Sequence, residues 1–138
     1  MLMSNEVVLH TYFIERFILS IPFLVPFIIT WITYRSAPKI ILRPLSYIFI
    51  GFLLGFIIQV ILDAIFVYVI QLPLLPLKLH QEGLSPKEIA MIISTYNILS
   101  MVTYVATLLT SLTLVGYGVY RLVSIVKNTK NTFKIANH

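Results

Sequence analysis

Three long apolar stretches constrain this sequence more than any other feature. They run over residues 12–34, 45–72 and 89–126. Each has at least the roughly 20 residues that a helix needs to cross the hydrocarbon core of a bilayer. No stretch alternates with the period of two that membrane barrels show, and backbone groups in lipid must bond within their own segment. The sequence therefore predicts an all-α fold with three long hydrophobic helices.

The composition places these helices in a membrane. Hydrophobic residues make up 59% of the 138-residue chain and charged residues only 11%, whereas soluble domains carry roughly 25% charged residues. A soluble domain of this length would leave large apolar patches exposed. We therefore expect a multi-pass integral membrane protein. The net charge of +5 is spread over short segments between the apolar stretches, so we expect the lipid bilayer as a partner and no nucleic acid.

Helix bounds follow from the polar segments between the apolar stretches. We expect one membrane-embedded domain over residues 1–138, with helices at about 8–34, 45–72 and 86–127 and a basic polar tail at 128–138. Prolines should interrupt the chain, because a proline removes one backbone donor and its ring collides with the preceding turn. We expect a bend in the first helix at Pro22 and Pro26, and a non-helical segment around Pro38 and Pro44.

The third helix carries the clearest start signal. Ser85 stands at the N-cap, Pro86 at the first helical position and Glu88 three residues after the serine. This is a capping box, in which the two side chains satisfy two backbone amides that the helix leaves free. Between residues 89 and 114 no glycine, proline or charge offers a turn, so the sequence predicts one continuous helix.

Basic residues predict how the chain is oriented. Seven Lys or Arg residues lie in the segments 35–43 and 121–134, and three (Arg16, Lys78 and Lys87) would lie on the opposite side. Short loops rich in Lys and Arg stay on the cytoplasmic side. We therefore expect the N-terminus outside and the C-terminus inside.

A stripe of four residues marks one face of the second apolar stretch. Gly51, Gly55, Gln59 and Asp63 recur every four residues, a spacing that keeps them on one side of a helix. The G-x-x-x-G pair lets another backbone approach closely, while Gln59 and Asp63 cannot face lipid tails. The favoured interpretation is helix packing, within the chain or between copies. The alternative is an ion or proton path lined by Gln59 and Asp63.

Asp63 needs a partner, because an unpaired charge within a membrane crossing costs on the order of 3 kcal/mol. Arg16 enters the first stretch from the same side, and Asn97 lies at a similar depth in the third. We expect Arg16 to pair with Asp63 inside the helix bundle, with Asn97 nearby.

Small hydroxyl residues form a second stripe, on the third stretch. Ser100, Thr103, Thr107 and Thr110 recur in steps of three and four, as residues along a heptad seam do. Such residues permit close helix contact. Packing is again favoured over the wall of a polar conduit.

Residues Val115–Gly118 spell Val-Gly-Tyr-Gly and so resemble part of the selectivity filter of potassium channels. A filter needs a following helix that crosses the membrane, and too few apolar residues remain after Gly118 to supply one. We therefore do not infer a channel function from this resemblance. The sequence predicts a flexible or closely packed stretch of helix instead.

The residue types point away from catalysis. The histidines lie near ends or loops, and no two of them have the spacing of a metal site within a crossing. No phosphate-binding loop or catalytic motif occurs, so we expect no enzyme, cofactor or metal. The candidate residues for helix packing or a polar path are Gly51, Gly55, Gln59, Asp63, Arg16, Asn97, Ser100, Thr103, Thr107 and Thr110.

Three classes of function remain. The favoured one is a structural or accessory membrane protein that packs through its small-residue helix faces in a larger assembly, as a homo-oligomer or with other membrane subunits. The second is an oligomeric small channel or carrier with a polar path near Asp63. The third is a hydrophobic shell-forming protein, such as a viral coat or membrane protein.

Overall fold

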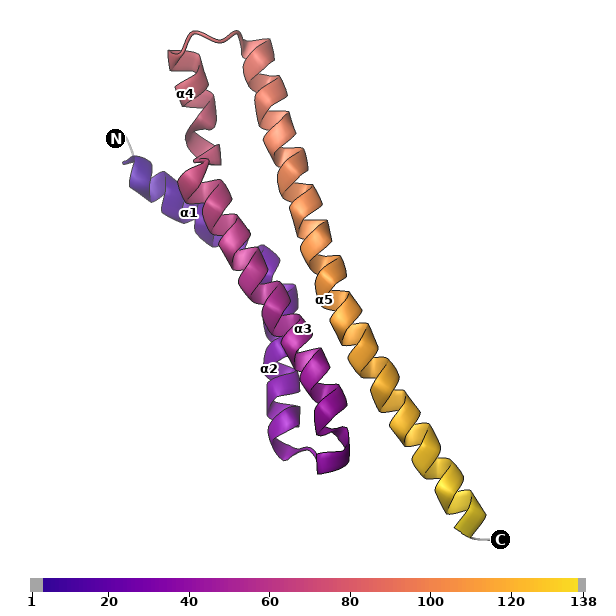
Figure 1. The fold of residues 1–138 in the computed structure, drawn as a ribbon. Coiled ribbons are helices and arrows are strands. Elements are labelled where there is room, and N and C mark those ends of the chain that lie inside the picture. Colours follow the sequence, from indigo (N-terminus) through magenta and orange to yellow (C-terminus); the bar gives the residue numbers. More distant parts are fainter. Residues whose placement is uncertain (1–3, 137–138) are drawn as a thin grey trace. The chain divides into compact units, whose positions relative to one another are not determined.

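The computed structural model describes the backbone of residues 4–136 and the side chains of residues 4–130, and this part of the chain is all-helical (Figure 1). The elements in order are α1 (Asn5–Phe17), the 3-10 turn η1 (Ile18–Ser20), α2 (Ile21–Ser36), α3 (Lys39–Ala64), the π-helical turn η2 (Ile65–Val69), the 3-10 turn η3 (Leu72–Leu74), α4 (Leu75–Gln81) and α5 (Pro86–Ala136). Three helical stretches are long and apolar enough to cross a membrane, namely Asn5–Ser36, Lys39–Gln81 and Pro86–Lys130. The predicted all-α class with three such helices is confirmed for these residues.

The chain forms two compact units. Unit 1 comprises Met1–Ile21 and Ile57–Thr107, and unit 2 comprises Pro22–Phe56 and Leu108–His138. Both units take part of α3 and part of α5. The single domain expected over 1–138 stays a prediction, because the units share these two helices.

The first span, predicted at about 8–34 with a bend at Pro22 and Pro26, contains a break just before Pro22. α1 ends at Phe17, one 3-10 turn follows, and α2 begins at Ile21. Pro22 explains the position of the turn, because it has no N–H to offer the carbonyl of Ile18 four residues earlier. That carbonyl accepts the N–H of Ile21 instead, which is the hydrogen bond of a 3-10 turn. Pro26 lies inside α2.

The second span begins and ends differently from the expected bounds of 45–72. α3 starts at Lys39, so only Ala37 and Pro38 separate it from α2, and Pro44 is accommodated inside the helix. The helix passes into the π-turn η2 and stops at Gln71, whose φ of 55° is left-handed. The segment between the second and third predicted helices contains the short helix α4, which ends at Gln81, and Gly83 shortly after it has a φ of 84°.

The third span begins at Pro86 with the hydrogen bonds of a capping box. The backbone N–H of Ser85 donates to Glu88 Oε2 at 2.9 Å, and the N–H of Glu88 donates to Ser85 Oγ at 3.4 Å. α5 is one unbroken helix that continues to Ala136, past the end expected at 127, so most of the segment predicted as a tail is helical. Lys134 and His138 belong to the tail side chains that lie outside the described residues.

Each unit has its own apolar core. In unit 1, α1 packs on η2 and η3, and the buried residues Leu9, Val67 and Leu74 form a cluster. In unit 2, Phe23 is buried in α2, and an aromatic group surrounds Phe49 of α3. Its ring centroid lies 5.2 Å from that of Phe27, 5.3 Å from that of Trp31 and 6.1 Å from that of Tyr34.

Candidate functional site

A buried ion pair joins α1 to α3 in unit 1. Arg16 Nε donates to Asp63 Oδ1 at 2.9 Å. The Arg16 side chain is 12% exposed and that of Asp63 only 1% exposed, so both charged groups are largely buried. The two side chains that the sequence predicts to pair therefore lie in direct contact.

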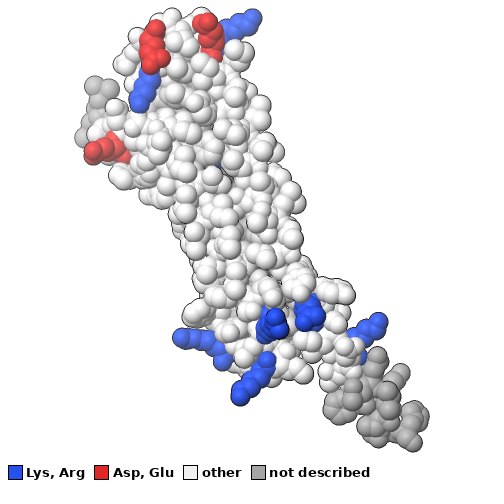
Figure 2. Space-filling view, viewed as in Figure 1, with Lys and Arg blue, Asp and Glu red and all other residues white. Residues whose placement is uncertain are grey.

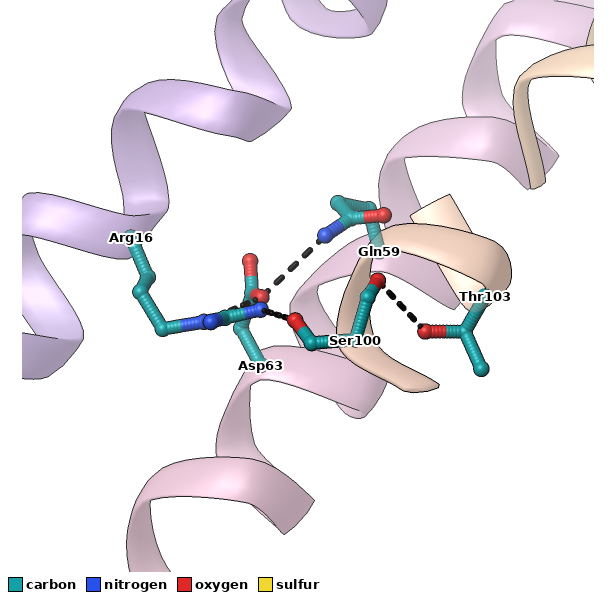
Figure 3. Close-up of polar contacts among 5 residues, drawn as sticks. All are labelled: Arg16, Gln59, Asp63, Ser100 and Thr103. Atoms are coloured by element: carbon teal, nitrogen blue, oxygen red, sulfur yellow. Dashed lines mark hydrogen bonds and ion pairs between the residues drawn. The ribbon is translucent and has the colours of Figure 1, made fainter. Parts of the chain in front are cut away.

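Two further side chains complete the hydrogen-bonded cluster around this pair (Figure 3). Ser100 of α5 accepts a hydrogen bond from Arg16 Nη2, which brings a third helix into the cluster. Gln59 stands one turn before Asp63 on α3, and its Nε2 donates to Asp63 Oδ1 at 3.1 Å. Thr103 of α5 donates from Oγ1 to the carbonyl of Ser100 at 2.9 Å and so supports the turn that carries the serine. We call Arg16, Gln59, Asp63 and Ser100 the polar cluster.

Two aromatic rings flank the guanidinium of the polar cluster. Arg16 Cζ lies 5.4 Å from the ring centroid of Phe66 and 6.0 Å from that of Tyr12. Rings at these distances attract the cation and exclude water from it. In such a low-dielectric setting the attraction between Arg16 and Asp63 is stronger than it would be at a surface.

Three polar atoms of unit 1 are buried without a hydrogen-bond partner among the described residues: Ser20 Oγ, Gln59 Oε1 and Asp63 Oδ2. Gln59 is 1% exposed, and Ser20 and Asp63 are fully buried. Gln59 precedes Asp63 by four residues, so these two side chains share one face of α3, and Ser20 lies in the 3-10 turn that follows α1. Two of the three are pure acceptors. Within the cluster, Asp63 Oδ1 accepts from both Arg16 and Gln59, while Asp63 Oδ2 accepts from no described group.

Close helix packing replaces polar contacts in unit 2. A Cβ atom on Gly51 would lie 2.9 Å from Val115 Cγ2, and one on Gly55 would lie 2.5 Å from the ring of Phe23. A Cβ on Gly118 would lie 2.6 Å from Ile48 Cγ1. These distances are shorter than van der Waals contact, so only glycine fits at the three positions without a rearrangement. Gly116, by contrast, has no atom within 4 Å of its hypothetical Cβ.

Ser111 of α5 adds a hydrogen bond to the close contact between α5 and Gly51 of α3. Its Oγ donates to the carbonyl of Gly51 at 2.8 Å, and Ser111 is 2% exposed. The predicted stripe named Thr110 as its last member, but Thr110 lies on the exposed side of α5 and Ser111 occupies the buried position. The two are adjacent in sequence, and either continues the spacing of three or four from Thr107. The sequence did not distinguish them.

The remaining candidate residues predicted from the sequence lie on α5. Ser100 is 7% and Thr107 4% exposed, and Thr103 is half-buried between them. Asn97 was expected beside the ion pair but is exposed one turn before Ser100. Positions 97 and 100 lie on the same side of α5 but one turn apart along its axis, and it is the serine that lies level with Arg16 and accepts its hydrogen bond. Ser20 and Phe66 were not predicted, although spacing by four from Arg16 would have pointed to Ser20. Gly118 lies in the stretch that the sequence predicts to be flexible or closely packed, and it is closely packed.

No protein-family model, curated protein or solved structure matches this chain. The described residues contain no group of three or more His, Cys, Asp or Glu side chains that could hold a metal ion. The described part of the chain is all-helical, and three of its helical stretches are long and apolar enough to cross a membrane.

Proposed function

We propose that this chain is a non-catalytic structural component of a membrane, with three crossings, the N-terminus outside and the C-terminus inside. One observation carries the structural role: among the side chains that the structure describes, the charged ones that are not exposed are Arg16 and Asp63, and these two are paired with each other. An enclosed pair fixes the register of helices. A transport path would instead need access from one side.

The contact surface of the proposed component is apolar. The glycine face of α3 is filled by side chains of the same chain, so Gly51 and Gly55 are not free to receive another protein. In unit 1, one face of α5 is exposed and carries Ile98, Met101, Val102 and Val105. In a membrane this face meets lipid tails or the helices of other subunits, since neither water nor a polar loop would stabilise it. We place the partners of a larger assembly here.

A second candidate, a small carrier with a path near Asp63, is favoured by one observation. Asp63 Oδ2 and Gln59 Oε1 are buried acceptors without partners among the described side chains. Such atoms attract protons, water or small cations. No contact among the described residues specifically favours the third function, a shell-forming protein.

Flux and mass measurements test the proposal together. The purified chain in liposomes should pass neither protons nor Na⁺ faster than empty liposomes. In mild detergent, extraction from its native membrane should give a complex heavier than the 15.8 kDa chain. A flux that Asp63→Asn abolishes, while Glu15→Gln at an exposed neighbouring carboxylate leaves it intact, would establish the carrier instead. Regular particles or tubes formed by the purified chain would favour the shell.

A further inference from the structure

A shallow apolar hollow lies on α5 within unit 2. It encloses about 400 Å³ and is lined by Leu122, Val123, Val126, Lys127 and Lys130. The first three side chains are apolar, with Val123 60% and Val126 52% exposed. The two lysines stand three residues apart, at the end of the hollow, on one side of the helix. The hollow thus combines an apolar surface with two positively charged side chains at one end.

The charge around this hollow is unbalanced. Unit 2 contains no Asp or Glu, and its basic residues are Arg35, Lys39, Arg43, Arg121, Lys127, Lys130 and Lys134. In Figure 2, Lys and Arg atoms gather at the end of unit 2 where α2 turns into α3, with no Asp or Glu atom among them. Lys127 and Lys130 are exposed and form no ion pair with any side chain that the structure describes. A ligand for this hollow must therefore bring its own negative charge.

We propose that the hollow binds an anionic phospholipid, with the phosphate on Lys127 and Lys130 and the upper part of an acyl chain along Leu122, Val123 and Val126. Two ammonium groups one turn apart can both donate to a single phosphate. The apolar floor gives the acyl chain the contact that a free phosphate could not use. The proposal is independent of whether the chain is structural or a carrier.

Unit 1 supplies an internal control. A second hollow on α5 has a similar volume of about 450 Å³ and is lined by Ala90, Ile93, Ser94, Asn97, Ile98 and Met101. It has an apolar floor but no charged residue in its lining. A lipid bound there should show no preference for headgroup charge.

Native mass spectrometry of the chain in neutral detergent, titrated with phosphatidylglycerol or phosphatidylcholine, tests the site. Each basic residue near an anionic headgroup contributes ~1 kcal/mol, so Lys127→Gln with Lys130→Gln should weaken phosphatidylglycerol binding by roughly tenfold or more. Phosphatidylcholine binding should not change. The matched pair Lys78→Gln with Lys87→Gln, in unit 1, should leave both lipids unaffected. Circular dichroism checks that each variant keeps its helices.

Four results would overturn the assignment. The first is equal affinity of the parent chain for the two lipids. The second is an equal loss in the Lys78/Lys87 variant, which would mean that overall charge and not the hollow binds lipid. The third is displacement of phosphatidylglycerol by millimolar inorganic phosphate, which would mean that the lysines bind phosphate alone. Val126→Asn should weaken phosphatidylglycerol binding with both lysines present, and an unchanged affinity would likewise exclude the acyl contact.

Discussion

Units 1 and 2 are built on the same two long helices yet are held together by opposite means. Unit 1 uses charge: it contains all five Asp and Glu residues of the chain, and Arg16 bonds to Asp63 and Ser100 at its centre. Unit 2 uses the absence of side chains: Gly51, Gly55 and Gly118 allow contacts that a methyl group would block. A polar network accepts few geometries because its donors and acceptors are directional, whereas glycine contacts fix mainly the distance between helices.

This difference predicts where the chain tolerates substitution. In unit 1, removal of one member leaves another buried and unsatisfied, which is the costly half of a polar contact. In unit 2, addition of atoms is the damaging change, because close-packed contacts have no spare room. The substitutions below test that contrast, from the largest expected effect to the smallest.

Asp63→Ala should have the largest effect, since it leaves the Arg16 guanidinium buried without its counter-ion. Breaking a buried pair by removing one partner costs about 3–5 kcal/mol, whereas replacing both by apolar residues is often neutral. The double variant Arg16→Met with Asp63→Leu should therefore recover most of the free energy of unfolding lost in the single variant. Denaturant unfolding in detergent micelles, followed by circular dichroism, measures both. A double variant as unstable as Asp63→Ala would contradict this account.

The same truncation, Ser→Ala, should cost more in unit 1 than in unit 2. Ser100 accepts from the charged Arg16, and hydrogen bonds to charged groups contribute roughly 1.5–3 kcal/mol. Ser111 donates to the neutral carbonyl of Gly51, a contact of about 0.5–1.5 kcal/mol. Unfolding of Ser100→Ala and Ser111→Ala under one set of conditions compares the two. Equal losses would mean that charge does not distinguish the units.

Glycine-to-alanine substitutions sharpen the contrast inside unit 2. Gly55→Ala and Gly118→Ala should each lower the free energy of unfolding by about 1–3 kcal/mol, the usual cost of overpacking. Gly116→Ala is the matched control two residues from Gly118, because its added methyl meets no atom. It should stabilise α5 by roughly 0.5–1 kcal/mol through reduced backbone entropy. A loss of stability in Gly116→Ala similar to that in Gly118→Ala would refute the packing explanation.

The sequence predicted positions better where chemistry left few choices. An aspartate deep in an apolar stretch requires a cation, and Arg16 was the basic residue available at that depth, so the pair could be inferred. The spacing of Gly51, Gly55, Gln59 and Asp63 fixed one face of α3, and all four are buried. The capping box located the start of α5 at Pro86.

Prediction was less successful where two neighbours satisfied the same spacing. Thr110 and Ser111 both continue the stripe, and the choice depends on where the carbonyl of Gly51 lies, which no local pattern states. The 3-10 turn before Pro22 was expected only as a bend, because the helix adjusts at the carbonyl that the proline leaves free and not at the proline itself. Pro44 was read as a breaker, although α3 accommodates it. The π-turn η2 has no simple sequence signal.

The ion pair also bears on the order in which the protein is made. Arg16 and Asp63 lie 47 residues apart along the chain. At a synthesis rate of 5–20 residues per second, the aspartate emerges roughly 2–10 s after the arginine. During that interval a newly made first helix carries its cation without the counter-ion. In the proposed arrangement of three crossings, Arg16 would then stay hydrated at the membrane boundary, and full insertion of α1 would wait for α3.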